Sequence, residues 1–340
     1  MPTKLNMSKF IGLFFMLLLV FSEAKSVHHD RVHRFNEWLV EHDIKPVNDV
    51  HLEQILRNWI HNDKYITMRN EQNLSYKLGH NMYSGMSNAE FSDLMRFDFN
   101  RDKFKDIKLD EFQYTFNSNL PESIDWRQKD AVTPIKNQGQ CGSCYSFSTT
   151  GALEGAFAIK YGVLYSFSEQ QIVDCSDNDG CNGGMYTTAW DWINKNGGIC
   201  NETSYPYTSG TTEKSGKCHK CNIVNGTAPI QYKEVSAKSD TAMMNALTIG
   251  PVSVAIEADQ QDFQLYSSGI FTAKCGTNLD HAVLLVGYGT DEKNQNYYIL
   301  KNSWGESWGE EGYMYLARGN YNNGEGQCGV LMAGAYPILA

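Results

Sequence analysis

The chain has 340 residues, more than one compact unit usually needs, so two or three segments are expected. Hydrophobic residues make up 41% of it, and 19 Tyr, 16 Phe and 7 Trp supply enough bulk for a well-packed interior. A formal net charge of −10 argues against a function in binding nucleic acid or another polyanion.

The N-terminus is predicted to be a signal peptide, residues 1–24. Two lysines precede an apolar run from Phe10 to Phe21 that is short for a bilayer-spanning helix, and small residues fit cleavage after Ala24. A membrane anchor is the alternative and would need a longer run. No later segment is apolar enough to span, so we expect entry into the secretory pathway and no membrane attachment after signal removal. The destination would be an acidic lysosome- or vacuole-like compartment, or the extracellular space.

Residues 25–118 contain no cysteine and are predicted to be largely helical. Apolar residues recur at helical spacing in "VHRFNEWLVEH" and in "LEQILRNWIHNDKYITM". The following "KLGHNMYSG" looks like a short strand and a turn. Near Asn119 the composition changes and becomes rich in Gly, Cys and aromatic residues. The N-terminal part is therefore either a removable segment or a second stable domain.

The part after Asn119 is predicted to contain helices first and strands later. "CYSFSTTGALEGAFAIKYG" reads as a buried helix, "FSEQQIVDCS" as a helix with Ser168 as candidate N-cap, and "MYTTAWDWINKNGG" as a helix that ends at Gly197 and Gly198. After Gln231, "PVSVAIEA", "AVLLVGYG", "NYYILKNSWG" and "GYMYLARG" have strand character. This order favours an α+β protein with two packed halves.

The 9 cysteines all lie between Cys141 and Cys328. An odd number in an oxidising compartment allows four bridges and one free thiol. In "QGQCGSCYSFS" two cysteines stand three apart, which fits a disulfide, a redox pair, a metal site, or a structural cysteine beside a catalytic one. N-glycosylation sequons at Asn73, Asn201 and Asn225 fit the same secretory route.

Cys144 is the candidate nucleophile. It stands where a Gly-rich loop passes into the first buried helix, and a helix N-terminus together with an imidazolium stabilises a thiolate. His281 precedes an apolar strand and Asn302 follows another, so they could act as the base and as the amide that orients its ring. Taken singly, such a His is more often a structural residue and such an Asn a turn residue.

Several long motifs together resemble the papain family of cysteine proteases, on its cathepsin L-like side. They are "QGQCGSCYSFS", "SEQQIVDCS", "GCNGGM", "YPYT", "LDHAVLLVGYG" and "YYILKNSWGESWGEEGYMYLARG"; the first contains a recognised signature of this family. The resemblance covers nearly the whole chain. It implies a papain-like two-lobed α+β fold in residues 119–340, with a helical lobe at about 127–230 and a β-barrel-like lobe at about 231–335. An inhibitory helical propeptide, residues 25–118, would precede it.

The resemblance also implies a role for each residue of the site. Cys144 would attack the scissile carbonyl, His281 would protonate the leaving amine, and Asn302 would orient the imidazole. The Gln138 side-chain amide and the backbone N–H of Cys144 would bind the oxyanion. Trp304 would shield the contact between His281 and Asn302 from water. No cofactor and no metal are expected.

Cys141 would then be a bridge cysteine. The resemblance implies the bridges Cys141–Cys181, Cys175–Cys218 and Cys275–Cys328, and the remaining pair suggests Cys200–Cys221. Exchange of partners between Cys218 and Cys221 stays open. A metal site at "CHKC" is disfavoured because the ligand cluster is short and the compartment is oxidising.

Substrate would bind in a groove between the two halves. Gly183 and Gly184 would offer backbone groups to an extended peptide. The other residues assigned to substrate binding are Met185, Tyr186, Ala255, Leu279, Asp280, Ala282 and Ala333. The positions of the second subsite are apolar or aromatic, and Ala333 leaves its base without a carboxylate, so Leu, Phe or Val is expected at P2. Each of these residues could also be an ordinary core residue.

The propeptide departs from the family pattern. His51 and Ile55 stand at the Glu and Arg positions of its helix signature, while Glu53 and Arg57 could form an ion pair two residues along. Gly85 replaces an Asp that the family links to release at acid pH, which leaves the pH dependence of self-activation open.

The sequence thus predicts a cysteine endopeptidase made as a zymogen and expected to be a monomer. Its partners would be protein and peptide substrates, its own propeptide as an intramolecular inhibitor, and cystatin-type inhibitors. A disulfide oxidoreductase using Cys141 and Cys144 is the alternative, but it would need a thioredoxin-like βαβ context. An inactive protease-like binding protein would usually have lost a catalytic residue. Tyr145, where most relatives have Trp, is expected to tune helix packing only.

Overall fold

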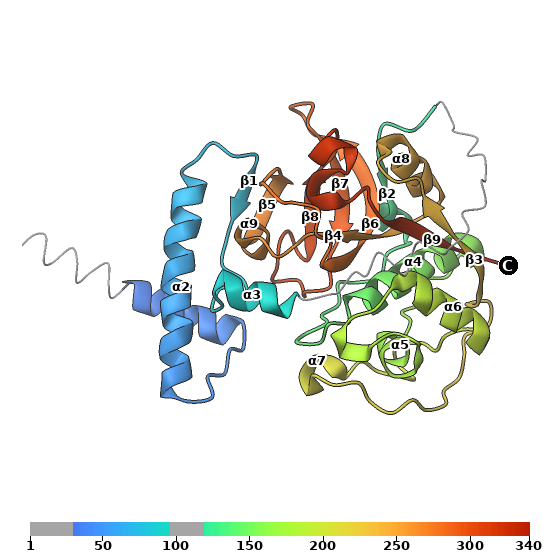
Figure 1. Ribbon diagram of the computed structural model, residues 1–340, viewed down its shortest axis with the longest axis horizontal. Coiled ribbons are helices and arrows are strands. Elements are labelled where there is room, and N and C mark those ends of the chain that lie inside the picture. Colours follow the sequence, from blue (N-terminus) through green and yellow to red (C-terminus); the bar gives the residue numbers. More distant parts are fainter. Residues whose placement is uncertain (1–29, 96–118) are drawn as a thin grey trace, which may run out of the picture.

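The computed structural model describes residues 30–95 and 119–340 (Figure 1). The predicted signal peptide, residues 1–24, lies outside these ranges, and so does the predicted end of the propeptide at residue 118. Within the described ranges, no helix is both long enough and apolar enough to cross a membrane.

Two helices form the N-terminal end of the described chain. The first covers residues 30–41, and α2 covers Asp49–Asn70 at the left edge of Figure 1. Apolar side chains at helical spacing join them in a small core of their own, made of Phe35, Trp38, Ile55 and Trp59. Both helices confirm the sequence prediction. The expected ion pair of Glu53 with Arg57 is present at 3.5 Å, but both side chains are exposed, so it adds little stability.

The segment after α2 adds a strand to the main sheet. β1 (Tyr76–Leu78) pairs antiparallel with β5 (Tyr266–Phe271), so the N-terminal segment occupies an edge of the sheet. The strand matches the prediction for this region. α3 (Asn88–Leu94), which follows, was not predicted, although Ser87 and Glu90 form a capping box at its start.

Helices α4 to α7 fill the lower right of the molecule in Figure 1. Their bounds are Cys144–Tyr161, Glu169–Cys175, Tyr186–Asn196 and Ser209–Thr212. The first three confirm the sequence prediction down to their ends. Ser168 caps α5 by accepting the N–H of Gln171 at 3.0 Å, and α6 ends at Gly197, whose φ is 79°.

The strands form one mixed sheet with the order β1-β5-β8-β7-β6-β4-β9-β3, and β2 pairs with β6. The pairing of β5 with β8 is parallel and the others are antiparallel. The bounds not yet given are β2 Ile124–Asp125, β3 Pro229–Val235, β4 Val252–Ile256, β6 His281–Thr290, β7 Asn296–Lys301, β8 Tyr313–Ala317 and β9 Gly334–Leu339, with helices α8 Asp240–Ile249 and α9 Gln261–Gln264. The four strands predicted after Gln231 are β4, β6, β7 and β8, whereas β3, β5, β9 and α8 were not predicted.

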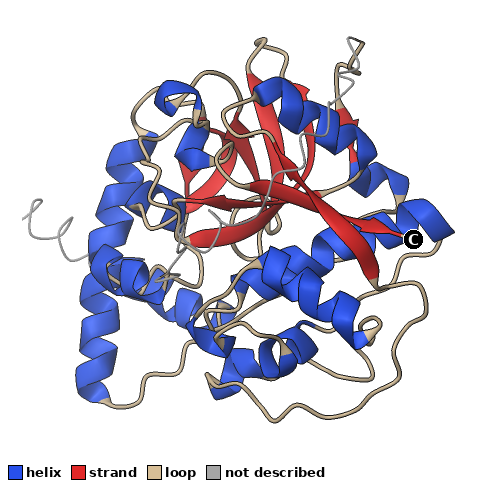
Figure 2. Ribbon diagram, turned by 45° about the vertical axis from the view of Figure 1, so that its right-hand side comes forward, coloured by secondary structure: helices blue, strands red, loops and turns tan. Residues whose placement is uncertain are grey.

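Helix α4 joins the two halves of the molecule. It is buried along most of its length and packs against β4, β6 and β9. A methyl group added at Gly151 would lie 2.7 Å from Leu284 Cδ2, and one at Gly155 would lie 2.6 Å from Pro251 Cδ, so both glycines permit the close approach of helix and sheet. Figure 2 shows the strands gathered across the upper part of the molecule, with helices beneath them and at their left.

Candidate active site

Cys144 is the first residue of α4, at the boundary between the two halves. It is buried and is the one cysteine without a bridge. Its Sγ accepts a hydrogen bond from the backbone N–H of Ala282 in β6, at 3.4 Å. This contact places the thiol beside the start of the strand that carries the candidate base.

His281 and Asn302 meet because their strands are neighbours. His281 is the first residue of β6, Asn302 directly follows β7, and these two strands pair antiparallel. The Nε2 atom of His281 lies 2.8 Å from Asn302 Oδ1, and both residues are buried. The Trp304 ring stacks on the His281 ring with centroids 4.6 Å apart. The structure therefore brings His281, Asn302 and Trp304 into contact, with the Cys144 thiol against the backbone of the residue after His281.

Gln138 is held in one orientation beside the thiol. Its Oε1 accepts from the Ser303 hydroxyl at 2.6 Å, and its Nε2 donates to the carbonyl of Cys141 at 3.1 Å. Its backbone N–H also donates to the carbonyl of Ser303 at 2.8 Å. The amide N–H₂ group is thus directed toward the turn that precedes Cys144, where an oxyanion donor is needed.

Burial makes the neutral forms of both reacting groups the stable ones here. It raises the pKa of the Cys144 thiol to about 12, opposed by the N–H of Ala282. It lowers the pKa of His281 to about 4, opposed by the hydrogen bond to Asn302. The helix N-terminus favours a thiolate at this position, but burial outweighs the backbone N–H groups that lower the pKa of Cys144.

Aromatic residues of the N-terminal segment cover this site from one side. Tyr83 and Phe91 contact Trp304 edge-on, with centroids 5.3 and 5.5 Å away. Both are buried. Because Trp304 in turn stacks on His281, residues 30–95 add to the burial of the site through Trp304.

The same segment is anchored by a buried carboxylate of the β half. Asp262 in α9 accepts from the Tyr65 hydroxyl at 2.6 Å, from the Tyr76 hydroxyl at 2.5 Å and from Arg69 Nε at 3.2 Å. Main-chain contacts add to this anchor, since the backbone N–H of Gly79 donates to the carbonyl of Leu265 at 2.8 Å.

The predicted substrate-binding residues lie between α6 and the ends of β4 and β6. Ala255 and Ala282 are register partners, while the backbone N–H of Ala255 and the hydroxyl of Tyr186 donate to the carbonyl of Ala333 at 3.3 and 2.8 Å. Met185 lies in one buried cluster with Tyr186 and Ala282. The remaining members of the predicted set are Gly183, Gly184, Leu279 and Asp280.

These remaining members lie in loops. Gly183 and Gly184 lead into α6, and Gly183 has a φ of 115° that favours glycine. Leu279 is buried beside Gly329. Asp280 Oδ1 accepts from the N–H of Ala258 at 2.7 Å, and burial raises the pKa of this carboxyl to about 8.

The bridges in the structure are Cys141–Cys181, Cys175–Cys218, Cys200–Cys221 and Cys275–Cys328. Cys141 is therefore bonded away from Cys144, which disfavours the redox-pair alternative. Both cysteines of "CHKC" are bridged as well, and the described residues contain no group of His, Cys, Asp and Glu that could hold a metal ion. Tyr145 packs at the start of α4 and donates its hydroxyl to the carbonyl of Gly180 at 3.0 Å.

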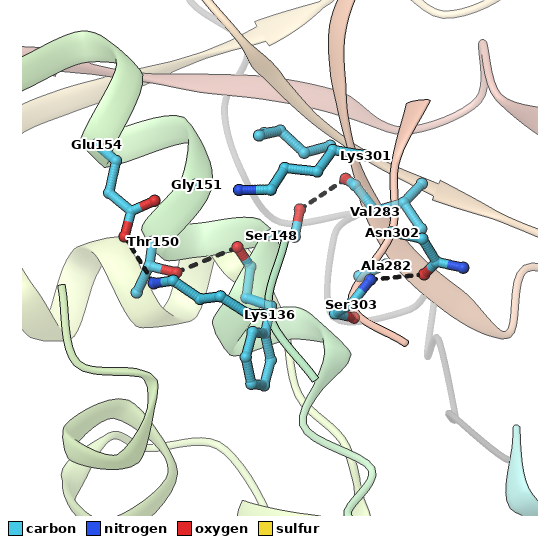
Figure 3. Close-up of a pocket in the computed structure, with 12 residues that line it drawn as sticks. Lys136, Ser148, Thr150, Gly151, Glu154, Ala282, Val283, Lys301, Asn302 and Ser303 are labelled. Carbon is cyan, nitrogen blue, oxygen red and sulfur yellow. Dashed lines mark hydrogen bonds and ion pairs between the residues drawn. The ribbon is translucent and has the colours of Figure 1, made fainter. Parts of the chain in front are cut away.

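A charged cluster behind the site escaped the sequence analysis (Figure 3). Lys136 donates to Glu154 at 2.8 Å and to Glu169 at 2.6 Å, and Lys301 donates to the carbonyl of Thr133 at 2.7 Å. Burial lowers the pKa of Lys301 to about 8. These residues adjoin a cavity of about 20 Å³ that reaches Asn302, roughly the space of one water molecule. A single acidic residue, Glu154, in the buried part of α4 was the available signal.

Comparison with known proteins places this site in a family. Residues 120–338 match the model of the papain family cysteine proteases. The chain is 42% identical over 312 residues to the probable cysteine protease RD21B of Arabidopsis thaliana, covering 89% of this chain and 66% of that protein. It is 38% identical over 354 residues to vignain of Ricinus communis, covering 98% and 95% of the two chains.

A solved proform shares the same architecture. The proform of the ragweed pollen cysteine protease Amb a 11 superimposes with a TM-score of 0.81 and 35% identity, covering 91% of this chain and 95% of that chain. The chain spans just under two thirds of the RD21B sequence but nearly the whole of this proform.

Proposed function

The chain belongs to the papain family of cysteine proteases, and from this premise we propose that it is a cysteine endopeptidase made as a proenzyme. The observation that carries the proposal is the placement of Cys144 at the N-terminus of α4, where its thiol accepts the backbone N–H of Ala282, the residue after a His281 whose ring is held by Asn302 at 2.8 Å. This is the arrangement that nucleophilic catalysis by a thiol requires.

In the proposed reaction, Cys144 Sγ attacks the scissile carbonyl after His281 takes the thiol proton. The tetrahedral oxyanion accepts hydrogen bonds from the Gln138 side-chain amide and the Cys144 backbone N–H. The C–N bond then breaks, the amine leaves with the proton from His281, and a thioester remains. Water, deprotonated by His281, attacks the thioester and releases the acid and the thiol. Asn302 keeps the ring in plane, and Trp304 excludes water.

We further propose that residues 25–118 are an inhibitory propeptide and that residues 119–340 form the mature enzyme. The contacts made by β1 with β5 and by Asp262 with α2 support this division, because strand pairing and hydrogen bonds hold the segment against the β half. In this proposal residues 1–24 direct the chain into the secretory pathway, which the four disulfides favour. An acidic compartment or the extracellular space is the proposed destination.

An apolar or aromatic side chain is proposed at P2. The side chains around this subsite are apolar or aromatic. The Tyr186 hydroxyl donates its hydrogen to the carbonyl of Ala333, so it does not offer that hydrogen to a substrate. Glycans are proposed at Asn73, Asn201 and Asn225, of which Asn73 and Asn225 are exposed. We also propose that cystatin-type inhibitors bind the enzyme and that the enzyme is a monomer.

The test is activation of the purified full-length proenzyme at acid pH, with a Phe-Arg reporter peptide as substrate. The wild type should process itself and cleave the reporter, whereas Cys144→Ala should do neither. A Cys144→Ala proenzyme processed by added wild type should remain inactive after the added enzyme is removed. Equal activity of the two mature proteins, or no activity in either after full processing, would overturn the proposed function.

A further inference from the structure

Tyr207 touches both segments that would form the oxyanion site. Its hydroxyl donates to the backbone carbonyl of Gln138 at 2.8 Å, and Ser143 Oγ lies 2.7 Å from the same hydroxyl. Ser143 directly precedes Cys144, and Gln138 carries the other proposed donor. A single phenol oxygen therefore bridges the two stretches of chain on which the proposed oxyanion donors are mounted.

The Tyr207 side chain is itself held firmly. Its backbone N–H donates to Glu202 Oε1 at 2.7 Å, and its ring meets Phe147 of α4 edge-on with centroids 5.0 Å apart. Three residues later, the carbonyl of Gly210 accepts the N–H of Gln140 at 3.2 Å. The stretch after Tyr207 thus supports the loop before α4 at a second point.

The stretch from Tyr207 to Gly210 also limits the space available to the loop before α4. A methyl group added at Gly139 would lie 2.4 Å from the carbonyl oxygen of Gly210, so the two backbones are in direct contact. The contact limits how closely the Gln138–Ser143 loop can approach Gly210, and the Tyr207 hydroxyl bridge together with the Gly210–Gln140 hydrogen bond opposes its separation from this stretch.

We propose that Tyr207 is a positioning residue for the oxyanion hole, whose hydroxyl fixes the Gln138 amide relative to the Cys144 backbone N–H. This inference rests on the proposed endopeptidase function. Loss of one oxyanion donor typically lowers kcat by about 10²–10³-fold, and small displacements have a part of this effect. Removal of the Tyr207 hydroxyl should therefore lower kcat by roughly tenfold while leaving KM nearly unchanged, because the loop does not form the second subsite.

Tyr205 supplies a matched control in the same motif. Its hydroxyl donates to Asp174 Oδ2 at 2.8 Å, and Asp174 directly precedes Cys175 of the Cys175–Cys218 bridge. Tyr205→Phe deletes the same atom from the same residue type two positions away. It should retain the kcat of the wild type, whatever it does to stability.

The experiment compares mature wild type, Tyr207→Phe and Tyr205→Phe in kcat and KM for the reporter and in the rate of Cys144 alkylation by iodoacetamide. Alkylation needs the thiol and His281 but no oxyanion hole, so Tyr207→Phe should lower kcat and leave the alkylation rate within about twofold. In a Gln138→Ala background, Tyr207→Phe should have little further effect on kcat, since the donor that it positions is already gone.

The inference is overturned if Tyr207→Phe keeps the wild-type kcat, or if its alkylation rate falls as far as kcat. It is also overturned if the Gln138→Ala background loses a further tenfold. Should Tyr207→Phe fail to fold, Ser143→Ala breaks the other side of the bridge and must lower kcat with unchanged alkylation. An inactive wild type would instead refute the proposed endopeptidase function, so the two failures can be told apart.

Discussion

Gly85 lies directly against Ile55 in the N-terminal segment. A methyl group added at Gly85 would lie 2.9 Å from Ile55 Cγ2 and 2.8 Å from Trp38 Cη2. These are two positions at which the sequence departs from the family pattern, with Ile in place of Arg and Gly in place of Asp. The two departures are therefore adjacent in space, at an apolar contact that Trp38 completes.

Introducing the family residue at only one of these positions should loosen the segment. Gly85→Asp would place a carboxylate against Trp38 and Ile55 without a cation, at a cost of about 2–3 kcal/mol. The full-length variant should process itself faster than the wild type at pH 7, as followed by gel electrophoresis and reporter cleavage. Gly85→Ala separates steric overlap from charge, and the double variant Ile55→Arg with Gly85→Asp should recover part of the loss. No recovery would show that the two positions are not coupled.

His80 is expected to respond to acid in place of the missing Asp. Its Nε2 lies 3.3 Å from Asp63 Oδ1, its ring stacks on Trp59 at 4.4 Å, and its buried Nδ1 has no partner among the described residues. Burial lowers the pKa of His80, although Asp63 opposes this. Arg34 and Arg31 also face this carboxylate, at 2.8 and 3.2 Å.

The sign of the pH dependence follows from the direction of this shift. Because the folded pKa of His80 lies below 6.5, the folded N-terminal segment is fully stable above that pH and loses stability as the pH falls toward the folded pKa. The pKa of Asp63 is also lowered: burial opposes this, but hydrogen bonds from Arg34 and His80 outweigh it. The Asp63 ion pairs therefore persist until the pH falls below the usual range of an Asp, and His80 responds first.

Replacing His80 should shift acid activation. His80→Gln keeps a polar side chain that does not titrate, so the pH midpoint of self-processing should fall by roughly half a unit. His61→Gln, on the exposed face of the same helix that carries Trp59, is the matched control and should not change the midpoint. An unchanged midpoint in His80→Gln would assign acid sensing to another group.

Local signals explain which parts of this fold are predictable from sequence. Ser168 and Gly197 mark helix ends by their own chemistry, and the apolar runs of β4 and β6 are long enough to indicate strands. The short strand β5 was not predicted; it pairs with β1, which lies almost 200 residues earlier, and no local pattern reveals that pairing. The start of α8 has a recognisable N-cap, because Ser239 accepts the N–H of Ala242 at 3.1 Å. The helix was nevertheless not predicted, because the segments around it have strand character.

In the candidate site too, some features could be predicted from the sequence and others could not. Cys144, His281 and Asn302 carry motifs that can be recognised, whereas the direction in which the pKa of each of the first two is shifted depends on its burial in the folded chain. Tyr207 stands in a recognisable motif, yet its function follows only from the two distances that its hydroxyl makes. The sequence alone therefore did not reveal these pKa shifts or the contacts of Tyr207, because both depend on residues that are distant in the chain.

Asp262 should control inhibition without controlling catalysis. It accepts hydrogen bonds from Tyr65, Arg69 and Tyr76 of the N-terminal segment, and removing one partner of such a buried network typically costs about 3–5 kcal/mol. Asp262→Asn in the full-length chain should therefore process itself faster at neutral pH. Once mature, it should have the kcat and KM of the wild type, because these partners have been removed. A lower mature kcat would place Asp262 in the catalytic machinery, against this view.

The thiol of Cys144 should be far less reactive in the proenzyme than in the mature enzyme. Burial raises its pKa to about 12 and lowers that of His281 to about 4, so neither the thiolate nor the imidazolium is stable while the segment is docked. Undocking exposes Trp304 by removing Tyr83 and Phe91, which relieves part of this desolvation.

Iodoacetamide at pH 7.5 should accordingly label the proenzyme at least ~100-fold more slowly than the processed enzyme, since alkylation depends on the thiolate. The eight bridged cysteines do not react, so one equivalent of label reports this residue alone. Unfolded, non-reduced proenzyme should take up that one equivalent, and Cys144→Ser should take up none. Equal labelling rates before and after processing would mean that docking leaves the thiol ionised, and inhibition would then be steric alone.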